Sequence, residues 1–135
     1  MSELLQGFMT PYARLWLSAF LITQLIEVSL GWLVLWRLNR HRPDPMPLTP
    51  LHLTLVLFMA SALTHPPLWF VLVKLRRWGF SYEQYVLIGE LFAWLTEALW
   101  YKLALRPLKQ RLSLALLLSL TLNSASYLIG VLISM

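Results

Sequence analysis

The chain has 135 residues, of which 59% are hydrophobic and only 13% are charged, whereas a soluble domain carries about 25% charged residues. This composition excludes a soluble globular domain and indicates an integral membrane protein. The absence of cysteine excludes disulfide bonds, thiolate metal ligands and a cysteine nucleophile. The formal net charge of +5 does not indicate nucleic-acid binding, because the basic residues lie at the ends of apolar stretches, where they set topology and contact lipid headgroups.

Four apolar stretches follow one another along the chain. A bilayer core of roughly 30 Å requires about 20 apolar residues per helix, so the chain has room for four spans with short loops. The sequence predicts spans at residues 12–36, 51–73, 81–105 and 112–134, in a single transmembrane domain over residues 1–135. The expected fold class is therefore an all-α integral membrane protein, a four-transmembrane-helix bundle.

The first stretch begins after Thr10 and Pro11, an N-cap hydroxyl followed by a proline at the first helical position. Glu27 lies near its middle, with Thr23 and Gln24 on the same helical face. A carboxyl at the centre of a bilayer costs a few kcal/mol, so it marks a functional site by default. The alternative is a protonated Glu27 that only joins two helices by hydrogen bonds.

The second stretch contains the run Thr64-His65-Pro66-Pro67. The two prolines remove two amide donors and oppose the carbonyls of the preceding turn, so we expect the span to kink or break here. A half-helix that ends at His65 would offer free carbonyls and the negative end of its dipole to a cation. The alternative is a simple proline kink in which His65 is bonded to a neighbouring carbonyl.

The third stretch carries Glu90 and Glu97, which share one face because they are seven residues apart. Gly89 and Ala93 form a small-x-x-x-small pattern that would bring another helix close to these carboxyls. Glu90 lies nearer the outer interface and is interpreted as solvated. Glu97 lies deeper and is the stronger candidate for a functional residue.

A stripe of small polar residues, among them Asn123 and Ser126, runs along the fourth stretch. Such stripes allow close helix packing and inter-helix hydrogen bonds, which is the expected purpose of most of this one. Asn123 is the exception, because its amide could orient a carboxyl or a ligand atom. Its depth matches that of Glu27, His65 and Glu97.

The two halves of the chain, residues 12–73 and 81–134, resemble each other. Each contains a carboxyl-bearing helix, a connector and a helix with a small polar residue three positions before a hydroxyl. These residues are Glu27, Ser61 and Thr64 in the first half and Glu97, Asn123 and Ser126 in the second. Copies of a two-span unit lie parallel, related by an axis along the membrane normal. We therefore expect two similar helical hairpins that arose as an internal repeat.

The basic residues predict the orientation of the chain. Most of the 11 Lys and Arg residues fall in the first and third loops or at the end of the third span. The positive-inside rule then places loops one and three in the cytoplasm and both termini outside. Because the chain is small and compact, we expect a bacterial inner membrane.

The sequence predicts one substrate- or ion-binding site near the midplane, and its residues are Glu27, Thr64, His65, Glu97, Asn123 and Ser126. The leading hypothesis is transport of a cation or a small polar substrate, in which the carboxyls exchange protons or coordinate the ion. Because four helices are few for a transport path, we expect a homo-oligomer or a partner membrane protein in addition to the lipid bilayer, and no nucleic acid.

Two alternatives remain open. In the first, a divalent metal held by Glu27, His65 and Glu97 activates water in an intramembrane hydrolase. In the second, the protein is a non-catalytic membrane subunit or scaffold, and the polar residues only fix helix register. The His-Glu-x-x-His and Gly-x-Ser-x-Gly motifs are absent, so the sequence assigns no catalytic residue and leaves open whether the protein is an enzyme.

Overall fold

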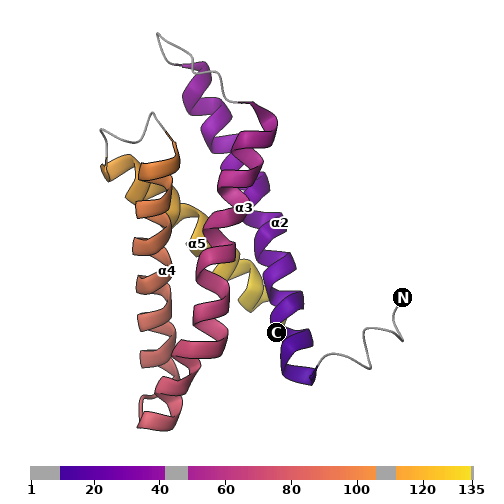
Figure 1. Cartoon of the computed structure of the whole chain (residues 1–135), viewed down its shortest axis with the longest axis vertical. Coiled ribbons are helices and arrows are strands. Elements are labelled where there is room, and N and C mark those ends of the chain that lie inside the picture. Colours follow the sequence, from indigo (N-terminus) through magenta and orange to yellow (C-terminus); the bar gives the residue numbers. More distant parts are fainter. Residues whose placement is uncertain (1–9, 42–48, 106–111, 135) are drawn as a thin grey trace.

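The computed structural model describes residues 10–41, 49–105 and 112–134, which form an all-helical bundle (Figure 1). The elements are α2 (Pro11–Arg40), α3 (Pro50–Pro66), the π-helical turn η1 (Pro67–Val71), the 3-10 helix η2 (Leu72–Trp78), α4 (Tyr82–Ala104) and α5 (Leu112–Ser134). Helices adjacent in sequence pack on each other, and α5 also packs on α2. The four long helices therefore form a closed ring, with α2 diagonal to α4 and α3 diagonal to α5.

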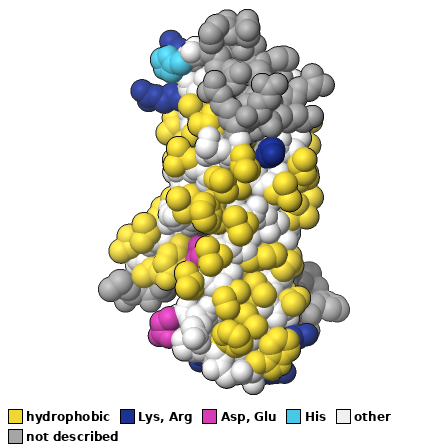
Figure 2. Space-filling view, turned by 90° about the vertical axis from the view of Figure 1, so that its left-hand side faces the viewer, with side chains coloured by type: hydrophobic (Ala, Val, Ile, Leu, Met, Phe, Trp, Pro, Cys, Tyr) yellow, Lys and Arg dark blue, Asp and Glu magenta, His cyan; other side chains and the backbone are white. Residues whose placement is uncertain are grey.

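Three helical segments are long and apolar enough to cross a membrane: Pro11–Arg40, Pro50–Trp78 and Leu112–Ile133. The fourth helix, α4, has 23 residues and is not in this set, because Glu90 and Glu97 lower its hydropathy. Hydrophobic side chains cover the flank shown in Figure 2, and the Lys and Arg side chains visible there lie towards its two ends. This distribution is the one that a lipid bilayer requires of its contact surface.

The half of the bundle nearest loops one and three is filled by an apolar core. Its centre is built from Leu57, Leu122 and Tyr101, which are fully buried. Gly31 lies against this core, and a Cβ atom there would approach Leu57 Cδ2 to 2.5 Å. Glycine at this position therefore allows α2 and α3 to pack closely.

The helix after His65 changes geometry but does not break. Regular α-helix ends at Pro66 and continues as η1 and η2 to Gly79, whose φ of 90° ends the helical run. Both prolines have helical backbone angles, since the φ that their rings impose suits a helix. The predicted connector from Lys74 to Phe80 is thus mostly 3-10 helix, so the helical run extends beyond residue 73, and the end of the second span stays a prediction.

Candidate functional site

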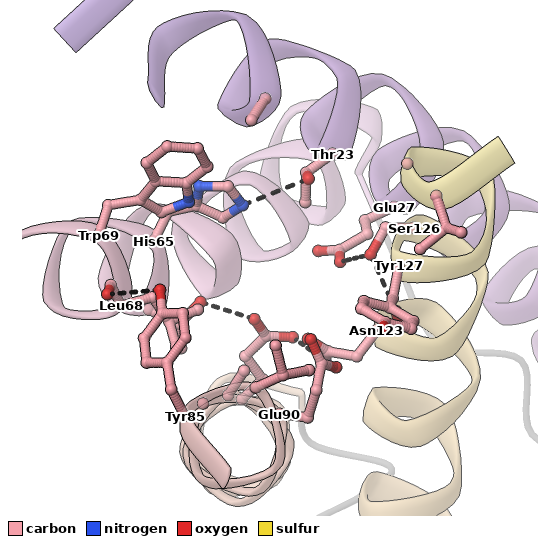
Figure 3. Close-up of a pocket in the computed structure, with 18 of the residues that line it drawn as sticks. Thr23, Glu27, His65, Leu68, Trp69, Tyr85, Glu90, Asn123, Ser126 and Tyr127 are labelled. Atoms are coloured by element: carbon pink, nitrogen blue, oxygen red, sulfur yellow. Dashed lines mark hydrogen bonds between the residues drawn. The ribbon is translucent and has the colours of Figure 1, made fainter. Parts of the chain in front are cut away.

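A cavity of about 350 Å³ lies between the four helices, in the half of the bundle nearest the α3–α4 turn (Figure 3). The six residues predicted to form the site all line it: Glu27, Thr64, His65, Glu97, Asn123 and Ser126. The structure therefore brings residues from all four helices to one place. Their role in binding stays a prediction.

Glu27 reaches the cavity from the middle of α2 and is 1% exposed. One of its carboxyl oxygens accepts a hydrogen bond from Ser61 Oγ at 2.5 Å, and the other accepts one from Ser126 Oγ at 2.7 Å. Ser61 belongs to α3 and Ser126 to α5. Each oxygen of this buried carboxyl is thus satisfied by a neutral donor from a different helix.

Glu97 has the corresponding environment on α4 and is also 1% exposed. Thr64 Oγ1 donates to one carboxyl oxygen at 2.8 Å, and Asn123 Nδ2 donates to the other at 2.7 Å. The Asn123 amide is held in place by a second bond, to the carbonyl of Ser119 at 3.0 Å. Asn123 thus contacts a carboxyl, and the orienting role that the sequence suggests for it stays a prediction.

The hydrogen bonds of the two carboxyls correspond to each other when the two halves of the chain are exchanged. The bond from Ser61 then corresponds to the bond from Asn123, since each links a carboxyl to the next helix in its own half. The bond from Ser126 corresponds to the bond from Thr64, since each links a carboxyl to the other half.

The buried positions of α3 and α5 repeat the same spacing. The positions that share it are Leu53, Val56, Leu57, Ala60 and Ser61 on α3, and Ala115, Leu118, Ser119, Leu122 and Asn123 on α5, whereas burial on α3 continues to Thr64 and His65. Both runs begin in the apolar core and end at a side chain that donates to a carboxyl. The buried faces of the two helices thus agree over these positions only, because Thr64 and His65 are buried on α3 while Ser126 and Tyr127 on α5 are more exposed.

His65 lies on the opposite side of the cavity from Glu27 and Ser126 (Figure 3). Its Nε2 is 3.2 Å from Thr23 Oγ1, and its ring meets Phe20 edge-on, with 5.4 Å between ring centroids. Its Nδ1 is buried and has no partner among the described residues. The histidine therefore bonds a hydroxyl on α2 and neither of the two buried carboxyls, and the carbonyl partner considered from the sequence is not observed.

Two tyrosines donate hydrogen bonds to backbone carbonyls of the irregular segment that follows the prolines. Tyr12 donates to the carbonyl of Trp69 at 2.6 Å, and Tyr85 donates to that of Leu68 at 3.3 Å. Both carbonyls lie in η1, where the change from π to 3-10 geometry interrupts the regular ladder of backbone bonds. These carbonyls follow the two prolines, whereas the sequence predicts free carbonyls in the turn before them, and that expectation stays a prediction.

Glu90 is the residue that the sequence-based interpretation undervalued. It is not simply solvated near the interface: it is partly buried and lines the cavity beside Tyr85 and Tyr127. Its carboxyl makes no hydrogen bond to any residue in the described part of the chain, unlike those of Glu27 and Glu97. The seven-residue spacing from Glu97 was the available signal, because it places both carboxyls on one face of α4.

The geometry gives no support to a metal centre. The described residues contain no group of three or more His, Asp or Glu side chains that could hold one metal ion. Glu27 and Glu97 instead accept hydrogen bonds from hydroxyl and amide donors. Binding of a metal by Glu27, His65 and Glu97 would require these bonds to be replaced.

The chain matches no protein-family model, and no curated protein and no solved structure is significantly similar to it. Its class therefore rests on its own fold and site. They define a small helical membrane protein whose interior holds a polar network of glutamate, histidine, hydroxyl and amide side chains.

Proposed function

We propose that the cavity binds a cation or a small polar substrate of positive charge, and that the protein transports it. The observation that carries this proposal is the set of ionisable groups in the cavity wall. Glu27, Glu90 and Glu97 all line it, and no lysine or arginine of the described chain does. Carboxylates buried without a counter-charge are costly, and a bound cation offsets that cost.

The network around the carboxyls suits a site that gains and loses protons. A serine or threonine hydroxyl donates to an ionised carboxyl and equally accepts from a protonated one. Ser61, Ser126 and Thr64 provide three such hydroxyls. Glu27 and Glu97 are therefore suited to exchange protons for the bound cation, while Asn123 keeps Glu97 oriented.

All four long helices, α4 included, are proposed to cross the membrane. The 23 residues of α4 extend over about 35 Å, which is enough for a hydrocarbon core of roughly 30 Å. Its outer face is a row of leucines four residues apart, Leu87, Leu91, Leu95, Leu99 and Leu103, each 44–61% exposed. Such a row suits lipid contact, while Glu97 lies on the buried side of α4 and Glu90 lies between the two sides.

The orientation follows the positive-inside rule. The ends of α2 and α4 and the beginnings of α3 and α5 lie at one end of the bundle (Figure 1), which we propose is cytoplasmic. The cavity lies in the other half and would face outside. The apolar core around Leu57 closes its cytoplasmic side, so a transport path requires helix movement or a second copy of the chain.

The correspondence between the two halves supports descent from a duplicated hairpin. In that case the two carboxyls are equivalent by origin, and the unequal residue Glu90 is a later specialisation of one half. Because Phe20 lies on α2 seven residues before Glu27, as Glu90 does before Glu97, only the second half supplies a carboxyl at this depth.

A scaffold function is the second candidate, because every oxygen of Glu27 and Glu97 is satisfied within the protein. Transport and scaffold functions predict different results in proteoliposomes. If the site transports a cation, the parent protein shows proton- or cation-driven flux, and Glu27→Gln and Glu97→Gln each abolish it. Glu83→Gln, at the exposed start of α4, is the matched control and keeps the flux. No flux in the parent, or equal flux in all four proteins, refutes transport.

A further inference from the structure

A second cavity adjoins the acidic one on the flank between α4 and α5. Its volume is about 400 Å³, and its wall is largely apolar, with Leu87, Leu91 and Trp94 on α4 and Leu120 and Leu128 on α5. All four of these leucines are 44–61% exposed, on the surface that we propose contacts lipid. We call this second cavity the α4–α5 groove.

The groove and the acidic cavity share part of their walls. Glu90, Asn123 and Tyr127 line both of them. A ligand that fills both therefore has one polar end near the carboxyls and one apolar end against leucines that face the bilayer. A ligand of uniform polarity would satisfy only one of the two cavities.

The charge of the acidic cavity selects the polar end. A phosphate or carboxylate headgroup would need Arg or Lys partners, and the described residues lining the two cavities include neither. An ammonium group is matched by the partnerless carboxyl of Glu90. Trp69, Tyr85 and Tyr127 add aromatic rings to the same wall, which favour cations by cation–π attraction.

We propose that the ligand is a single-chain amphiphilic amine, whose ammonium head occupies the acidic cavity at Glu90 and whose alkyl chain lies in the α4–α5 groove. This inference rests on the proposed cation site and names its substrate class. The ligand enters sideways from the bilayer between α4 and α5, so no opening to water is required. From Leu120 to Leu128 the groove extends over about 12 Å of helix, enough for a chain the size of dodecylamine.

The test compares four probes by the thermal stabilisation that each gives to the protein in an uncharged detergent. Dodecylamine is expected to bind at least about tenfold more tightly than butylamine, which has the head but no long chain. Dodecanol and dodecyl phosphate have the chain without the positive charge and are expected to give no stabilisation. Binding of either as tight as that of dodecylamine overturns the proposal, because the site would then not select an amine.

Variants of α5 separate the groove from the rest of the lipid-facing surface. Leu128→Trp fills the groove, and it is expected to lower dodecylamine affinity about tenfold more than butylamine affinity. Leu117→Trp is the matched control, because Leu117 and Leu128 are both 59% exposed on α5 and only Leu128 lines the groove. Ser124→Phe obstructs the same groove from a neighbouring position and replaces Leu128→Trp if that variant does not fold.

The outcomes distinguish this inference from the cation site on which it rests. Equal affinity for butylamine and dodecylamine, unaffected by Leu128→Trp or Ser124→Phe, overturns the amphiphile and leaves the cation site intact. Failure of both amines and of sodium and potassium ions to stabilise the protein overturns the cation site, and the amphiphile with it.

Discussion

Glu27 and Glu97 lie on diagonally opposite helices, yet both accept their hydrogen bonds from the same two helices, α3 and α5. The two carboxyls are therefore held by shared supports and not by a contact with each other. This arrangement makes the polar network a structural unit of the whole bundle. Its consequences are testable on stability as well as on transport.

The equivalence of the two carboxyls predicts equal energetic effects. Glu27→Gln and Glu97→Gln each replace one accepting oxygen by an NH2 group, which must donate to a hydroxyl that otherwise donates to the carboxyl: Ser61 or Ser126 for Glu27 and Thr64 for Glu97. Because the hydroxyl can reverse its role, each variant should destabilise the protein by no more than about 1 kcal/mol. Unfolding in mixed micelles measures both. Costs that differ by more than about 2 kcal/mol would contradict the equivalence.

Asn123 should contribute more to the free energy of unfolding than its small size suggests. Asn123→Leu removes the donor to Glu97 and leaves a buried carboxyl oxygen unpaired, at a cost of about 1–3 kcal/mol. Ser124→Leu, one residue along and exposed to lipid, is the control for volume and is expected to be nearly neutral. The same unfolding assay compares them, and similar losses in the two variants would show that the hydrogen bond contributes little.

Gly31 should tolerate no side chain without relief from its neighbour. Gly31→Ala places a Cβ 2.5 Å from Leu57 Cδ2, and such overpacking costs about 1–3 kcal/mol. Adding Leu57→Ala removes the clash, so the double variant should be more stable than the sum of the single losses predicts. Gly130→Ala, with nothing within 4 Å of the new Cβ, is the neutral control. Strict additivity of the pair would argue against close packing at this point.

The hydrogen bond from Tyr85 to η1 should make a measurable contribution to the stability of the protein. Tyr85→Phe removes the hydroxyl that donates to the Leu68 carbonyl and should cost about 1 kcal/mol. Tyr82→Phe, on the same turn of α4, removes a hydroxyl that makes no hydrogen bond to a described residue, and it should cost less. Thermal unfolding distinguishes the two, and the reverse order of losses is the result that would count against this role of Tyr85.

Topology can be read directly because the chain has no cysteine. Single substitutions His41→Cys and Ser81→Cys place one thiol at each end of the bundle. In intact cells, a membrane-impermeant maleimide should label Ser81→Cys and leave His41→Cys unlabelled until the cells are lysed. The opposite labelling pattern would reverse the orientation.

The sequence predicted the residues whose burial in a bilayer is costly. It did not predict features that depend on how the helices pack against one another. Glu27, His65 and Glu97 could be recognised because burying such residues in a bilayer is costly. Their shared depth predicted that they would line one site. Glu90 could not be assigned by depth alone, since whether it meets water, lipid or a cavity depends on how α5 lies against α4. The α4–α5 groove was invisible for the same reason.

The sequence predicted where the regular helix of α3 ends, but not the path of the chain after it. Two consecutive prolines predict the loss of two backbone hydrogen bonds, and regular α-helix does end at Pro66. Whether the chain then bends away or continues depends on contacts with other helices. Tyr12 and Tyr85 provide such contacts from two other helices by donating to the carbonyls of Trp69 and Leu68, and no local pattern around Pro66 and Pro67 reveals them.

The shared supports of the two carboxyls also bear on how the site responds to a ligand. Asn123 and Ser126 are three residues apart on α5, and one bonds Glu97 while the other bonds Glu27. A shift of α5 away from both α4 and α2 would lengthen both bonds in the same movement. Binding at one carboxyl would thereby affect the other. The pair should bind a titrated ligand cooperatively, with a steeper binding curve than two independent sites give.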